Sequence, residues 1–189
     1  MLNHIRPALT LVIVMTALTG LAYPLGINGI AQAVMPDKAN GSLIERDGKV
    51  IGSSLIGQTF TSDRYFWPRP SATGPDPYNA AASSGSNLGT TSVKLKDRVT
   101  ADVARLTGTG VAQPVPGDAV TTSGSGLDPH VSPAFAEAQV ARIATARGLE
   151  PAAVAALVAQ HVDNPDFGVI GEARVNVLEL NLALDALKI

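Results

Sequence analysis

Hydrophobic and polar positions divide this chain into two parts with different patterns. Residues 7–35 contain no Asp, Glu, Lys, Arg or His, so 29 consecutive positions are uncharged. A helix needs roughly 20 mostly apolar residues to cross about 30 Å of hydrocarbon. The run therefore predicts a membrane-spanning helix, with its densest apolar stretch over residues 9–23.

A cleavable signal peptide is the alternative interpretation of this run. Ala31 and Ala33 match the small-x-small cleavage pattern, and Arg6 with the amino terminus forms a thin positive region. The uncharged run is longer than the usual 7–15-residue signal core, which favours an uncleaved anchor. In both cases the positive end stays in the cytoplasm, so the rest of the chain emerges on the other side. We expect an anchor over residues 1–36 and one extracytoplasmic domain over residues 37–189.

The second part of the chain mixes helical and strand patterns. Asp47-Gly48 between two short runs predicts a β-hairpin over residues 42–52, and residues 55–60 either extend its second strand or turn out of it. Apolar periodicity and capping residues predict helices over residues 92–106, 133–147, 151–161 and 180–188. Further strands are expected over residues 119–122 and 174–177. Because these elements are interspersed without strict βαβ alternation, we predict an α+β fold.

One long segment separates the hairpin from the first of these helices. Seventeen of the 25 positions in residues 68–92 are Pro, Gly, Ser, Thr or Asn, which predicts a loop. Loops of this length inside compact domains are uncommon and usually functional or flexible.

Composition removes several classes of function. The chain has 14 Lys+Arg and 16 Asp+Glu, a formal net charge of −2, and no cysteine. Without cysteine there is no disulfide scaffold, thiolate zinc site or thiol nucleophile. The near-neutral charge provides no strong field for binding nucleic acid.

Catalytic candidates are weak. Ser125 and His130, with Asp118 or Asp128, permit the hypothesis of a membrane-anchored or secreted serine hydrolase, but the Gly-x-Ser-x-Gly elbow is absent. The simpler interpretation is that Asp128 starts a turn into the following helix. No His or carboxylate group has the spacing of a metal site. We therefore assign no catalytic residue and no metal ligand.

Two segments are candidates for binding. Residues 83–89 form a small-residue loop before a helix, where backbone N–H groups can cradle phosphate, although no Walker lysine accompanies them. The alternative is a tight turn with a helix cap. Residues 64–70 gather three of the eight aromatic residues, Tyr65, Phe66 and Trp67, beside Arg69. This composition fits an interface anchor and an aromatic core equally well. Gly20 lies among small residues in mid-span, where close helix–helix contact is favoured.

Several unusual strings occur in order along nearly the whole chain. They are LIGQTF at residues 55–60, YFWPRPSA at 65–72, YN at 78–79, SNLG at 86–89, SGSGLDPHVSP at 123–133 and RVNVLELN at 174–181. With the spanning segment ahead of them, the chain resembles the C subunit of the Kdp-type potassium-transporting ATPase, a P-type ATPase.

The resemblance implies a non-catalytic accessory subunit in the inner membrane. Its partners would be the ion-conducting and ATP-hydrolysing subunits, and potassium would be the ion that the complex transports. The family is described as a catalytic chaperone that raises the ATP affinity of the hydrolysing subunit. On this resemblance alone, the nucleotide-contact candidates are Ser84, Gly85, Ser86 and Asn87. The expected orientation conflicts with that role, because it places this loop on the side without ATP.

Overall fold

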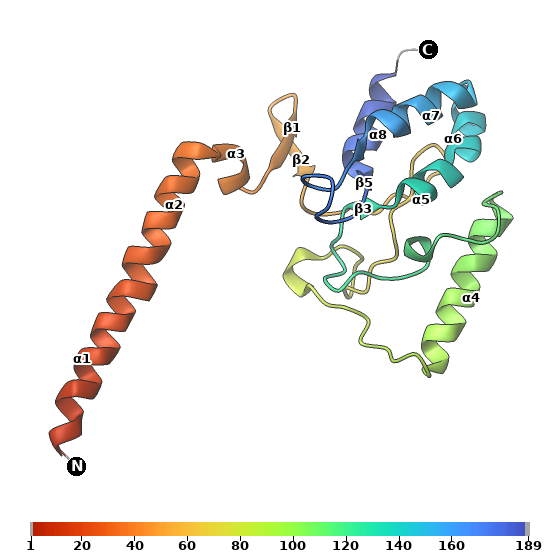
Figure 1. The fold of residues 1–189 in the computed structure, drawn as a ribbon. Coiled ribbons are helices and arrows are strands. Elements are labelled where there is room, and N and C mark those ends of the chain that lie inside the picture. Colours follow the sequence, from red (N-terminus) through yellow and green to blue (C-terminus); the bar gives the residue numbers. More distant parts are fainter. Residues whose placement is uncertain (1, 188–189) are drawn as a thin grey trace. The chain divides into compact units, whose positions relative to one another are not determined.

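The computed structural model describes residues 2–187. They form two compact units, one ending at Ile51 and the other beginning at Gly52 (Figure 1). One unit holds a long apolar helix, and the other combines helices with a small antiparallel sheet. The predicted α+β class with one apolar amino-terminal helix is confirmed.

The first unit is dominated by a continuous helix. After a 3₁₀ turn, η1 (Leu2–His4), it consists of α1 (Ile5–Met15), the π-helical η2 (Thr16–Ala22) and α2 (Tyr23–Val34). The 30 residues Ile5–Val34 have a mean hydropathy of 1.9. At about 1.5 Å per residue the helix measures about 45 Å, which exceeds the ~30 Å of a hydrocarbon core. Its length and composition therefore suit a membrane span.

The π-helical turn has a local cause. Pro24 has no N–H to donate to the carbonyl group of residue 20, so the regular hydrogen-bond ladder is interrupted where η2 widens. The hydroxyl groups of Thr10 and Thr19 donate to the carbonyl oxygens of Arg6 and Met15, at 2.9 and 2.7 Å. These bonds satisfy the polar groups within the helix itself, as an apolar surrounding requires.

The hairpin predicted over residues 42–52 is present. After the short α3 (Pro36–Ala39), β1 (Leu43–Arg46) pairs with β2 (Lys49–Ser53). Asp47 and Gly48 have φ angles of 53° and 73°, the two positive values that a type I′ turn requires. An antiparallel bridge between Ser53 and Ile56 then ends the strand, so residues 55–60 turn out of the hairpin.

The second unit is built around four helices and a three-stranded sheet. Helix α7 (Pro151–Gln160) packs against α5 (Pro133–Ala138), α6 (Val140–Arg147) and α8 (Val177–Ala186). In the sheet, β5 (Arg174–Asn176) lies between β3 (His130–Val131) and β4 (Val162–Asp163), and Val175 stands opposite both Val131 and Val162. The fully buried apolar side chains of this core include Phe66, Leu106, Phe135, Ala136, Ile143, Val154, Val158, Val175, Leu180 and Leu184.

Local signals place the helix ends. Ser92 Oγ accepts a hydrogen bond from Leu95 N at the start of α4 (Val93–Gly108), and Ser132 Oγ accepts one from Phe135 N at the start of α5. Gly148 ends α6 in the left-handed region, at φ 69°. The expected helix over residues 133–147 is divided at Gln139, whose N–H bonds to the carbonyl of Ala136 in a tighter turn.

Four further elements differ from the predictions. The strand expected over residues 119–122 is wrong, because η4 (Gly117–Ala119) curls there and Ala119 and Val120 are buried without strand pairing. Strands β3 and β4 have only two residues each and leave no periodic signal. Helix α8 begins at Val177, where Asn176 caps it, and ends at Ala186; expected helix residue 188 lies outside the described residues.

The loop predicted over residues 68–92 is confirmed, with one short 3₁₀ turn, η3 (Ala80–Ala82).

Candidate functional site

Two buried amide side chains hold the backbone of the aromatic segment. Asn181 of α8 accepts a hydrogen bond from Phe66 N at 2.8 Å and donates to Phe66 O at 3.0 Å. Gln139, between α5 and α6, accepts from Trp67 N at 2.8 Å and donates to Trp67 O at 3.2 Å. Each amide pairs with both backbone groups of one residue, as a neighbouring strand would, so the N–H and C=O groups of Phe66 and Trp67 are hydrogen-bonded inside the core.

Arginine side chains cover the aromatic rings on either side of Phe66. The Trp67 ring lies 3.9 Å from the Arg142 guanidinium carbon and 5.1 Å from that of Arg105, both within cation–π range. Arg147 lies 4.8 Å above the Tyr65 ring and forms a 2.7 Å ion pair with Asp185. Burial lowers the pKa of Arg142 to about 10, partly offset by Asp63.

The structure places the four interface candidates of this segment at different depths. Phe66 is 0% exposed and Trp67 is 8% exposed, so both are core side chains of the second unit. Tyr65 and Arg69 are partly buried and keep some surface. An interface role stays a prediction for the segment, and a partner would meet Tyr65 and Arg69 rather than the Phe66 ring.

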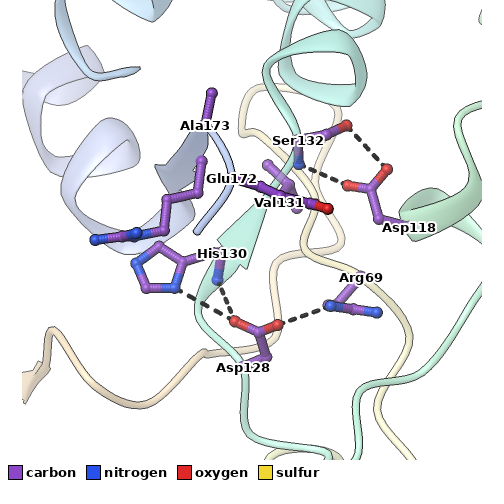
Figure 2. Close-up of a pocket in the computed structure, with 9 residues that line it drawn as sticks. Arg69, Asp118, Asp128, His130, Val131, Ser132, Glu172 and Ala173 are labelled. Carbon is purple, nitrogen blue, oxygen red and sulfur yellow. Dashed lines mark hydrogen bonds and ion pairs between the residues drawn. The ribbon is translucent and has the colours of Figure 1, made fainter. Parts of the chain in front are cut away.

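A polar cavity of about 420 Å³ opens beside the start of β3 (Figure 2). Asp128 stands between Arg69 and His130. Its Oδ2 lies 2.7 Å from Arg69 Nη1, and its Oδ1 accepts a hydrogen bond from His130 N at 3.0 Å. The His130 ring nitrogen Nδ1 is 3.4 Å from the same Oδ1. Asp118, Glu172 and Arg174 are the other charged residues of the lining.

Hydrogen bonds and the Arg69 charge together outweigh the effect of burial on the pKa of Asp128. Partial burial alone would raise the pKa of Asp128, but bonds from the His130 side chain and backbone and from Arg69 lower it to about 2. Asp128 is therefore a carboxylate at all physiological pH values. Next to it, burial and the Asp128 charge raise the pKa of Tyr78, whose hydroxyl donates to the Arg69 carbonyl at 2.6 Å. These groups form a satisfied structural network.

Asp118 has a similar structural role at the opposite wall. Its carboxylate accepts from Ser132 N at 2.6 Å and from Ser132 Oγ at 2.9 Å, which fixes the cap of α5 (Figure 2). The backbone around Asp118 is a 3₁₀ turn, closed by hydrogen bonds from Ala119 N to Pro116 O at 3.1 Å and from Val120 N to Gly117 O at 3.3 Å.

The geometry does not support the serine hydrolase alternative. Ser125 Oγ accepts from Leu127 N at 3.1 Å and lies 3.4 Å from Ser123 Oγ, whereas His130 faces Asp128. Among residues 2–187, no hydrogen bond joins Ser125 to His130, so the nucleophile–base contact that such catalysis requires is missing. Nor do the side chains in this described range form a group of three or more potential metal ligands.

The small-residue loop over residues 83–89 packs against a second small-residue loop. Ser84 N donates to Ser125 O at 2.9 Å, and a Cβ atom on Gly85 would lie 3.1 Å from Gly124 O. Gly126, at φ 69°, leaves no room for a side chain beside Ser84 O. The next α-helix begins at Val93, six residues after Asn87, so this loop does not sit at a helix N-terminus. The nucleotide-contact assignment of Ser84, Gly85, Ser86 and Asn87 stays a prediction.

Gly20 lies within η2, on the long apolar helix of the other unit. A Cβ atom there would approach Thr16 Cγ2 at 3.9 Å, an ordinary contact, so the chain itself does not require glycine. Its proposed role in helix–helix contact stays a prediction.

The described residues combine one helix that is long and apolar enough to cross a membrane with an α+β unit. Residues 5–186 match the family described as "K+-transporting ATPase, c chain". The chain is 57% identical over 186 residues to the "Potassium-transporting ATPase KdpC subunit" of Allorhizobium ampelinum, covering 98% of this chain and 97% of that protein. It is 58% identical to the subunit of the same name from Polaromonas naphthalenivorans, covering 100% and 97%. This chain belongs to the KdpC family, as its sequence motifs predicted.

Family membership makes the chain a membrane-associated subunit of a potassium-transporting P-type ATPase complex. The residues that sequence reasoning missed are Gln139 and Asn181. Nothing in the local sequence marks a Gln or Asn as buried, since their partners lie 72 and 115 residues away.

Proposed function

We propose that this chain stabilises the assembled potassium pump and raises the ATP affinity of the ATP-hydrolysing subunit. It does so through contacts with the ion-conducting and ATP-hydrolysing membrane subunits, without catalysing a reaction itself. The observation that carries the proposal is the family match over residues 5–186. The non-catalytic part of the proposal is supported by the polar cavity, because the Asp118 and Asp128 carboxylates there are held by hydrogen bonds and an ion pair within the chain.

The proposed topology has one inner-membrane span, a cytoplasmic amino terminus and an extracytoplasmic domain. We keep residues 1–36 as the anchor and residues 37–189 as the domain. Arg6 and the amino terminus are the positive charges at one end of the apolar helix, which favours retention of that end in the cytoplasm. Ser83 is exposed, and the chain has no cysteine. In Ser83→Cys, a membrane-impermeant thiol reagent should label intact cells; labelling only after cytoplasmic access would contradict this topology.

An extracytoplasmic domain leaves only an indirect route to nucleotide affinity. Residues 83–89 contain no lysine, and their loop precedes α4 without forming its N-terminus. An exposed helix end contributes typically 0.3–1 kcal/mol to anion binding, whereas millimolar affinity already corresponds to about 4 kcal/mol. We therefore expect ATP to bind the isolated full-length chain no tighter than about millimolar.

Two measurements test the proposal. Purified pump lacking this chain should need a higher ATP concentration for half-maximal hydrolysis than the complete complex, and adding the chain should restore the lower value. Calorimetry of the full chain in mild detergent should show no micromolar ATP binding. Micromolar binding that depends on Ser86 and Asn87 would contradict the indirect route, and an unchanged ATP requirement would contradict the chaperone role.

A further inference from the structure

The connection between β4 and β5 carries an exposed apolar tip. Phe167 is 94% exposed, Val169 is 81% exposed and Ile170 is 60% exposed, all within four residues. Single exposed apolar side chains are normal on protein surfaces, but contiguous clusters mark interaction sites. In the described part of the second unit, the other large exposed apolar side chains are Leu55 and Val93, which stand apart in the sequence.

The tip is a closed turn and not a loose loop. Asp166 and Ile170 exchange two backbone hydrogen bonds, each of 2.9 Å, and Gly168 N donates to Pro165 O at 2.9 Å. Phe167 has a φ of 54°, a conformation that bulky residues rarely adopt. The hydrogen-bonded turn fixes the backbone that carries the exposed Phe167 ring. Binding of this ring to a partner would therefore cost little backbone conformational entropy.

The charges around the tip indicate which kind of surface it fits. Asp163, Asp166 and Glu172 are exposed, and Arg174 is the only basic residue in residues 163–174. An acidic rim is repelled by anionic lipid headgroups and attracted by Lys and Arg side chains. The combination of an apolar centre and an acidic rim is complementary to an apolar pocket with a basic rim on another protein.

We propose that residues 165–170 dock into an apolar, basic-rimmed pocket on a membrane subunit of the pump. This inference rests on the proposed function, because it takes the pump subunits as the partners. Phe167 is the central anchor, Val169 and Ile170 widen the apolar contact, and the acidic side chains orient it. Buried aromatic anchors at interface centres commonly dominate association energies.

The test compares variants in the full complex in mild detergent. Phe167→Ser should weaken retention of the partner subunits by about tenfold or more during dilution, because an aromatic anchor is lost. Val169→Ser should weaken it less. Val93→Ser is the matched control, since it makes the same change at a 70% exposed valine outside the tip. All three variants should melt at the same temperature as the unaltered chain.

A crosslinking measurement identifies the occupant directly. The cysteine-free chain permits a single photoreactive label at Phe167→Cys in the assembled complex. A crosslink to a pump subunit supports the inference, whereas crosslinks only to lipid or to a second copy of this chain overturn it. Equal retention by Phe167→Ser and the unaltered chain, or equal losses in Phe167→Ser and Val93→Ser, also overturn it. If the unaltered chain retains no partner, the proposed function fails together with the inference.

Discussion

Replacing Asn181 by leucine should remove the clamp on the Phe66 backbone while keeping the branched shape and the number of non-hydrogen atoms of the side chain. Asn181 is 2% exposed and makes hydrogen bonds of 2.8 and 3.0 Å to Phe66 N and O. A buried polar group left without a partner costs about 1–3 kcal/mol, so two such groups cost roughly 2–6 kcal/mol. For a unit of this size, 1 kcal/mol shifts the melting temperature by about 3–4 °C. We expect Asn181→Leu to lower the melting temperature by about 6 °C or more.

Trp67 is the only tryptophan in the chain and neighbours the clamp, so its fluorescence reports directly on this part of the core. Thermal unfolding of the full chain in mild detergent would be followed at this signal. Gln160→Leu is the control, because it replaces an exposed amide at the end of α7 and should change the melting temperature little. A shift of less than about 3 °C in Asn181→Leu would refute the argument that these two bonds hold the segment.

Three further outcomes are expected. Trp67→Ala should destabilise the fold by about 3–5 kcal/mol by creating a cavity between two arginines, measured by circular dichroism during denaturant unfolding. Gly20→Leu should weaken co-purification of the pump subunits while leaving membrane insertion intact, and unchanged co-purification would count against a helix–helix role. Folding lowers the pKa of Asp128 to about 2, so its stabilising effect is complete above about pH 4 and is lost as pH falls toward 2. In melting curves taken at successive pH values, Asp128→Asn should therefore lose less stability than the unaltered chain over this range.

Elements with a local cause could be predicted from the sequence. Ser92 and Ser132 cap α4 and α5 at the helix starts that the sequence predicted, and Gly148 ends α6. Asp47-Gly48 makes the predicted turn because these residues tolerate positive φ. The apolar helix follows from composition alone. In each case the residues that determine the structure are neighbours along the chain.

Elements with a distant cause could not be predicted. Gln139 divides a helix that local propensity would continue, and its amide bonds to Trp67 across 72 residues. Strands β3 and β4 exist because both of them pair with β5, and two residues carry no alternating pattern. The strand expected over residues 119–122 is wrong: backbone hydrogen bonds close a 3₁₀ turn at its start, and the Asp118 side chain in that turn is held by Ser132, 14 positions away. The periodicity of a sequence shows which positions are apolar. It does not show which distant residue will form hydrogen bonds with a polar side chain or with the backbone.

Composition also could not separate a core from an interface, because both use aromatic residues and arginine. The structure separates them through hydrogen bonds and exposure: Trp67 is 8% exposed with its backbone groups paired, while Phe167 is 94% exposed on a closed turn. Loss of assembly in Trp67→Ala should therefore accompany loss of folding, whereas loss of assembly in Phe167→Ser should occur in a chain that melts normally. Measuring the melting temperature and partner retention in the same two variants distinguishes these causes. Normal melting with lost assembly in Trp67→Ala would assign the tryptophan to the interface instead.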